Sequence, residues 1–189
     1  VFMSDDSKRV LDKSLAYLIG PIDEAEDQGI GWRRELIRLS EEYELKIKFL
    51  DPTNKLKGLQ QEVGTEQDKI ARYRARGRWK DLSDFMKVIV RVDLRQVDFS
   101  DFVIAKVDKN IHMCGSYHEI FVADIEKKPI LAIIKGGKKN APAWLFGILD
   151  HNLMFDDEEE CVKYLVKINN GDVELDDRWV LLRKQLDEI

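Results

Sequence analysis

Cysteine is scarce in this chain of 189 residues, which contains only Cys114 and Cys161. The two are far apart and form no CxxC motif, so the sequence predicts neither a disulfide framework nor a cysteine-based metal site. Long apolar runs are lacking too, since none approaches the roughly 20 residues that a membrane-spanning helix needs. Residues 1–13 are too polar for a secretory signal peptide. We therefore expect a cytoplasmic protein with no membrane partner.

Histidine is also rare, and His112, His118 and His151 do not have the spacing of metal ligands. We expect no metal and no cofactor. The Gly-x-Ser-x-Gly elbow of serine hydrolases is missing as well, although Ser116 has a histidine nearby. The sequence therefore argues against a metalloenzyme and against a serine hydrolase.

Glycine is sparse at the place where a dinucleotide-binding loop would need it. Gly29 and Gly31 begin a GxGxxG pattern, but Arg34 stands at the third glycine position, and the pair comes late after the preceding strand. A simpler interpretation is a loop that leads into a helix, whose N-terminus could hold an anion.

What the chain does contain is typical of one globular domain spanning residues 1–189. Its hydrophobic fraction is 44%, its charged fraction 35% and its net charge −5. A net negative charge does not favour nucleic-acid binding by the surface as a whole, so nucleic acid is not an expected partner.

Apolar runs alternate with amphipathic segments along most of the chain. The runs predict strands in residues 14–22, 46–52, 101–107, 128–135 and 152–155. Helical spacing predicts helices in residues 31–45, 115–126, 156–168 and 176–189. This alternation, with continuous apolar central strands, predicts an α/β fold: a flavodoxin-like or Rossmann-like three-layer sandwich on a mostly parallel five-stranded sheet.

Residues 55–92 interrupt this alternation between the second and third strands, and they predict a helical insertion broken near Gly77. Between Arg72 and Lys80, five basic residues alternate with Tyr73 and Trp79. One interpretation is an arm that meets a phosphate or a nucleic acid. The other, which we favour from the sequence, is a solvated helical hairpin of ordinary charge.

Each of Tyr17, Asp93 and Glu119 has an ordinary structural interpretation, but their order along the chain is suggestive. Ser116 and Glu119 match the S/T-x-x-E capping box, Asp93 taken alone is a surface acid, and Tyr17 lies within a strand, where a core role is the default. Their surroundings read "YLIGP", then Asp93, "SDFVIA", "GSYHE" and "KPI". This ordered set, over most of residues 14–135, resembles the nucleoside 2-deoxyribosyltransferase family and the related nucleotide N-glycoside hydrolases.

The resemblance implies a retaining transfer of a (deoxy)ribosyl group between nucleobases. Glu119 matches the family nucleophile, Asp93 the acid beside it and the departing base, and Tyr17 the tyrosine whose hydroxyl steadies the nucleophile. A carboxylate near a helix N-terminus is also favoured in its ionised form. The residues that we expect at the substrate are Gly20, Pro21, Trp32, Met113, Gly115 and Ser116, with the two glycines permitting close backbone approach.

One position departs from the family pattern. Six residues before the nucleophile, the transferases commonly carry an Asp for the sugar hydroxyls and the nucleotide hydrolases a Ser for the 5′-phosphate, whereas this chain has Met113. Nucleoside or nucleotide N-glycoside hydrolysis and a non-catalytic nucleotide-binding sensor therefore stay open beside base exchange.

The resemblance also implies a homo-oligomer. Residues 141–149 and the segment around Trp179 are the candidate interface elements, and both fit the core equally well.

Overall fold

The computed structural model describes residues 9–22, 25–54 and 63–179, and these residues form a parallel five-stranded sheet. The strands are β1 (Leu15–Ile19), β2 (Lys48–Leu50), β3 (Phe102–Val107), β4 (Ile130–Ile134) and β5 (Met154–Phe155). Their order is β2-β1-β3-β4-β5, and every pair is parallel. This is the flavodoxin-like arrangement, so the predicted fold class is confirmed.

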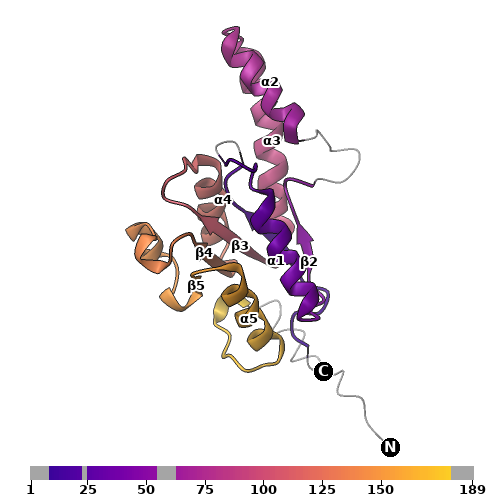
Figure 1. Cartoon of the computed structure of the whole chain (residues 1–189), viewed down its shortest axis with the longest axis vertical. Helices are drawn as coiled ribbons and strands as arrows, with labels where there is room; N and C mark the ends of the chain where they lie inside the picture. The colour runs from indigo at the N-terminus through magenta and orange to yellow at the C-terminus, as the bar shows by residue number, and fades with distance from the viewer. Residues whose placement is uncertain (1–8, 23–24, 55–62, 180–189) are drawn as a thin grey trace, which may run out of the picture.

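Successive residues of the central strands point to opposite faces of the sheet, and both sets are apolar. Helices therefore cover both faces (Figure 1). On one face, α1 (Ile30–Glu42) and α5 (Glu158–Asn169) pack together over a core that includes Ala16 and Leu18. On the other, α3 (Trp79–Phe99) and α4 (Cys114–Ile125) pack over Tyr17 and Ile19. Since side chains alternate across a strand, Tyr17 is directed to the face that carries α4.

The predicted insertion is a helical hairpin made of α2 (Val63–Ala75) and α3. Gly77 lies in the turn with a φ of 61°, a left-handed conformation that glycine adopts without strain. The hairpin stands out from the sheet toward the top of Figure 1, and α3 then runs back along α4. The insertion was predicted to end near residue 92, which is wrong: α3 continues to Phe99, because its apolar helical spacing persists through Val97, which is buried. Asp93 is therefore on α3, with residues 94–99 of that helix between it and β3.

The two candidate interface segments differ in burial. Trp179, in the short 3-10 helix η4 (Asp177–Trp179), is buried and packs on Phe102 with ring centroids 5.4 Å apart, so it belongs to the core. The rest of the predicted closing helix lies outside the described residues. In η2 (Ala143–Gly147), by contrast, the side chains of Trp144 and Phe146 are exposed. Within the described part of the chain, no helix has the length and apolarity to cross a membrane.

Candidate active site

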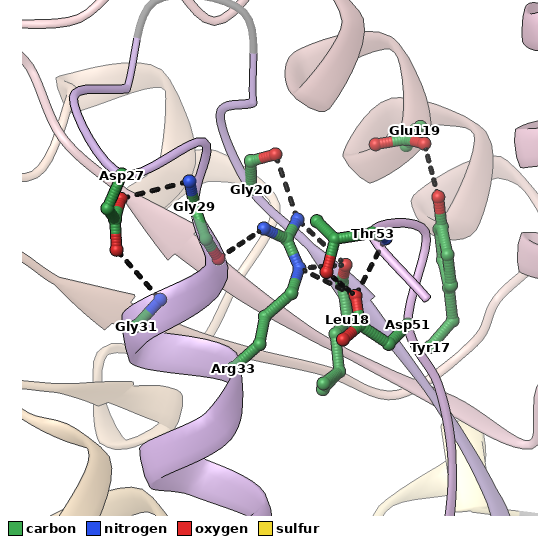
Figure 2. Close-up of polar contacts among 10 residues, drawn as sticks. All are labelled: Tyr17, Leu18, Gly20, Asp27, Gly29, Gly31, Arg33, Asp51, Thr53 and Glu119. Atoms are coloured by element: carbon green, nitrogen blue, oxygen red, sulfur yellow. Dashed lines mark hydrogen bonds and ion pairs between the residues drawn. The ribbon is translucent and has the colours of Figure 1, made fainter. Parts of the chain in front are cut away.

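Tyr17 and Glu119 meet although 102 residues separate them in the sequence. The Tyr17 hydroxyl donates a hydrogen bond of 2.7 Å to Oε1 of Glu119 (Figure 2). Tyr17 is fully buried in β1, and Glu119 is partly buried on α4. Burial raises the pKa of Tyr17 well above its usual range, and the negative charges of Glu119 and Asp93 raise it further. The phenol therefore stays protonated and remains a hydrogen-bond donor at neutral pH.

A cavity of about 170 Å³ lies beside this pair. It opens past the carboxyl ends of β1 and β2 and the N-terminal end of α4, and the helical hairpin forms its opposite wall. Ligands of open α/β sheets bind outside the carboxyl ends of the strands, at the point where the strand order reverses. Here that point lies between β1 and β3. Tyr17, Asp93 and Glu119 all line the cavity, so the structure brings the three predicted catalytic residues to one place.

The predicted capping box at Ser116 is wrong. The helix begins two residues earlier, at Cys114, and its N-cap residue Met113 makes no side-chain cap hydrogen bond. Ser116 is thus inside the first turn, buried and lining the cavity, and Glu119 is in the second turn. The helix macrodipole acts mainly within the first turn, so it contributes less to the ionised carboxylate than the sequence suggested. The hydrogen bond from Tyr17 is the stronger local interaction.

Met113 has a structural role that the sequence did not reveal. Its side chain is buried and lines the cavity, and its sulfur accepts a 3.3 Å contact from the backbone N–H of Asp108. The thioether thereby closes the loop between β3 and α4. A thioether is a weak acceptor, and this one already has a donor, so Met113 offers the cavity an apolar surface.

Gly20 and Pro21 follow β1 and line the cavity, but Trp32 does not. A Cβ at Gly20 would come within 2.8 Å of Cζ2 of Trp32, so the glycine is required for packing against the indole ring. At Gly115, by contrast, a Cβ would meet nothing within 4 Å. Gly115 is therefore the glycine whose missing side chain leaves open space at the cavity wall, and Gly20 is primarily a packing position.

Arg33 fixes the loop after β1 from behind the cavity. Its fully buried guanidinium donates to the carbonyl oxygens of Leu18, Gly20 and Gly29 at 2.7–3.4 Å (Figure 2). Its Nε lies 3.6 Å from Oδ1 of Asp51, at the end of β2. One side chain therefore joins α1 to the carboxyl ends of two strands. The sequence offered Arg33 as a possible substrate contact in place of the residue missing at Met113, but Arg33 does not line the cavity.

The N-terminus of α1 does not offer the anion site that the sequence suggested. The carboxylate of Asp27 accepts hydrogen bonds from the backbone N–H groups of Gly29 and Gly31, at 3.0 and 2.7 Å (Figure 2). These bonds to backbone N–H groups lower the pKa of Asp27, even though partial burial opposes them. The chain's own acid therefore occupies the position that a ligand anion would take.

Sequence reasoning missed the hairpin side of the cavity. Glu66, Gln67 and Ile70 line it from α2, and Met86, Ile89 and Val90 line it from α3 next to Asp93. A signal was present, because residues 86, 89, 90 and 93 have the i, i+3, i+4, i+7 spacing of one helix face. The spacing marks a helix face, but only the packing of α3 along α4 places that face at the cavity.

Carboxyl groups are the main ionisable groups that line the cavity. Glu66, Asp93 and Glu119 contribute three carboxyl groups, and the described residues that line the cavity include neither lysine nor arginine. Across the described part of the chain, His, Cys, Asp and Glu side chains nowhere gather in a group of three or more that could hold a metal ion.

Comparisons with known proteins add little to this geometry. No family model matches the chain, and no curated protein matches it. A solved structure described as a conserved protein from Enterococcus faecalis V583 is similar at 16% identity over 94% of this chain and 99% of that one, with a TM-score of 0.45. The fold and the candidate site therefore rest on the geometry of this chain alone.

Proposed function

We propose that this chain transfers a (deoxy)ribosyl group between nucleobases by cleaving the N-glycosidic bond, with Glu119 as the nucleophile. The observation that carries the proposal is the buried tyrosine hydroxyl on the Glu119 carboxylate, beside a second acid, Asp93, at the edge of a cavity. Two carboxyl groups and a donor at the switch point of an α/β sheet suit glycosyl transfer. Enzyme activity, nucleoside substrate and residue roles are all part of this proposal.

In the proposed reaction a carboxylate oxygen of Glu119 attacks C1′ of the sugar. The bond from C1′ to the base nitrogen breaks, its electron pair leaves with the base, and a glycosyl ester forms on Glu119. Asp93 orients the departing base or supplies its proton. Tyr17 holds the carboxylate in position through Oε1. The nitrogen of a second base then attacks C1′ as the ester bond breaks and frees the Glu119 carboxylate, and the N–H proton of that base returns to Asp93. The new nucleoside has the original anomeric configuration.

The charge of the cavity supports a nucleoside rather than a nucleotide as substrate. A 5′-phosphate would approach three carboxyl groups, with the imidazole of His112 but no lysine or arginine among the described lining residues. The apolar side chains of Met113, Ile70, Met86 and Ile89 suit the flat face of a base or the uncharged part of a sugar. We therefore expect the unphosphorylated compound to react faster than its 5′-monophosphate.

Base exchange tests the proposal directly. The protein is incubated with a deoxynucleoside and a different free base, and the new nucleoside is measured by chromatography beside free-base release without acceptor. Glu119→Ala removes the nucleophile and should abolish both reactions, whereas Glu126→Gln, just after the same helix and outside the described cavity lining, should keep wild-type rates. Full turnover by Glu119→Ala would refute the mechanism. Base release without exchange would instead establish a hydrolase.

A mass measurement separates the enzyme from a binding sensor. Without acceptor base, the wild-type chain should gain the mass of one sugar residue, and Glu119→Ala should not. Tight nucleotide binding by calorimetry, with neither adduct nor turnover over hours, would identify a sensor that retains the fold without the chemistry.

We also propose that the chain forms a homo-oligomer. The exposed aromatic side chains of Trp144 and Phe146, in one of the two candidate segments, support this. Light scattering of the wild-type chain should give a multiple of 22.1 kDa, and Trp144→Ser should shift the chain toward the monomer. A monomeric wild type at micromolar concentration would exclude a stable assembly.

A further inference from the structure

The outer end of the helical hairpin carries a second cavity that the proposed chemistry does not use. It measures about 160 Å³ and is lined by Lys69, Arg72, Tyr73, Arg76 and Arg78. Four of these five side chains are cationic, and none of them lines the cavity at Glu119. The two cavities therefore differ in charge as well as in position.

Aromatic contacts between the helices hold this cationic cavity in shape. Tyr73 of α2 packs edge-on against Phe85 of α3, with ring centroids 6.1 Å apart. The ammonium group of Lys69 lies 5.4 Å from the Phe85 ring centre, and the guanidinium of Arg78 lies 5.3 Å from that of Tyr73. Cation–π contacts of this kind orient the cations without neutralising them.

Most of the cations here lack a compensating acid. Arg78 pairs with Asp81 at 2.7 Å, but Lys69, Arg72 and Arg76 form no ion pair among the described residues. Residues 69–80 contain six lysines and arginines and no acid, and the acids that follow, Asp81 and Asp84, pair with Arg78 and Lys80 at the C-terminal end of this stretch. The chain as a whole is acidic, so the sign of its charge reverses locally at this end of the hairpin.

An ordinary structural role explains only part of this pattern. Basic residues in the last turn of α2, such as Arg72 and Arg74, complement the negative end of the helix macrodipole. Stabilising the end of α2 requires neither a cavity nor a cation from another helix, yet Arg78, the N-cap residue of α3, lines the same cavity. The N-terminus of α3 has no side-chain cap there, so its partial positive charge adds to that of the cations.

The next residue along the chain, Trp79, identifies the class of ligand. Its side chain is 65% exposed, and it is the first residue of α3, directly after Arg78, which lines the cationic cavity. Single-stranded nucleic acids are bound by cationic surfaces that follow the phosphates and by aromatic rings on which bases stack. Four of the six cations in residues 69–80, Lys69, Arg72, Arg74 and Arg76, have no ion pair within the part of the chain that the structure describes, whereas Arg78 and Lys80 pair with Asp81 and Asp84. Four such cations exceed what one phosphate group needs, and they suit a chain of phosphates.

We propose that the outer end of the hairpin binds single-stranded nucleic acid, with the phosphodiester backbone at Lys69, Arg72 and Arg76 and a base stacked on Trp79. This site is separate from the one at Glu119 and does not depend on the function proposed there. The net negative charge of the chain does not favour nucleic acid as a partner, but the local charge at the outer end of the hairpin is positive and does.

Fluorescence anisotropy with labelled single-stranded DNA and RNA oligonucleotides tests the proposal on the full chain. Binding should weaken steeply as salt rises. Arg72→Ala/Arg76→Ala should weaken binding at least tenfold at low salt and reduce the slope of log K against log salt by about 1.4, since each lost contact to a single strand accounts for about 0.7. Trp79→Ala should weaken binding roughly tenfold by removing the stacking surface.

The matched control is Arg34→Ala/Arg91→Ala, which removes two exposed arginines that lie outside the cationic cavity. This control should keep the affinity within about twofold of wild type, and it should leave the slope of log K against log salt unchanged. Circular dichroism should show that all variants retain the wild-type helix content. Base exchange at Glu119 should be unchanged in every variant, so the two proposals fail or survive independently.

Four results would overturn the proposal. These are no oligonucleotide binding at about 20 mM salt, equal losses in the cavity variant and its control, binding of inorganic phosphate or pyrophosphate only, and binding of anionic lipid vesicles in preference to oligonucleotides. The last would assign the cationic end of the hairpin to a membrane surface.

Discussion

The hydrogen bond between Tyr17 and Glu119 can be measured without knowing the substrate, through a double-mutant cycle on stability. Tyr17→Phe removes only the hydroxyl group and keeps the ring, which is fully buried in β1. Glu119→Ala removes the acceptor. The bond is 2.7 Å long and partly buried, and hydrogen bonds to charged groups contribute about 1.5–3 kcal/mol. The two substitutions together should therefore cost about 1.5–3 kcal/mol less than the sum of their separate effects.

The assay is urea-induced unfolding at pH 7 of the wild type, both single variants and the double variant. A parallel cycle of Tyr17→Phe with Glu126→Ala serves as control, because Glu126 follows the C-terminal end of α4, remote from the hydroxyl. That control should be additive within about 0.5 kcal/mol. A coupling below about 0.5 kcal/mol for Tyr17 and Glu119 would refute the contact on which the candidate site rests.

Three further predictions concern Arg33, the two glycines and alkaline pH. Arg33→Met should lower the free energy of unfolding by about 3–5 kcal/mol, since it leaves the buried carbonyls without their guanidinium donor and Asp51 without its cationic partner; urea unfolding measures this. Gly115→Ala should leave stability unchanged or raise it by up to about 1 kcal/mol while slowing base exchange, whereas Gly20→Ala should lower stability by about 1–3 kcal/mol because its Cβ would strike Trp32. A slower Gly115→Ala variant that is also unstable would contradict the open space at the cavity wall. Burial raises the pKa of Tyr17 in the folded state above the value of about 10 that tyrosine has in the unfolded chain. The contribution of the protonated phenol to the free energy of unfolding is therefore complete below about pH 10 and is lost as the pH rises above it. Between pH 10 and 11 the wild type should lose up to about 1.4 kcal/mol more than Tyr17→Phe, and equal losses in denaturant titrations would argue against a buried, protonated phenol.

The sequence determined the fold class through the period of its apolar residues. Continuous apolar runs such as residues 130–134 can only be buried on both faces, and they alternate with amphipathic helices, so a parallel sheet between two helical layers follows. The break at Gly77 was also local, since it depends on the backbone freedom of one residue.

The order of motifs along the chain also selected Tyr17, Asp93 and Glu119 as candidates. Their meeting was a matter of topology. Placing β3 beside β1 and directing Tyr17 to the face that carries α4 set its hydroxyl against a carboxylate 102 residues away. No local sequence pattern could predict that these two side chains are in contact.

Other features depended on contacts between segments that no local pattern links. The capping box failed because the helix begins at Cys114, where the loop is closed by the sulfur of Met113 on the backbone of Asp108. The hairpin became one wall of the candidate site only because α3 packs along α4, and its basic residues became a cavity only because Tyr73 meets Phe85 across two helices. The sequence by itself determined the elements and the candidate chemistry, and the tertiary structure decided which side chains share a site, because strand order and helix packing join residues that are distant in the chain.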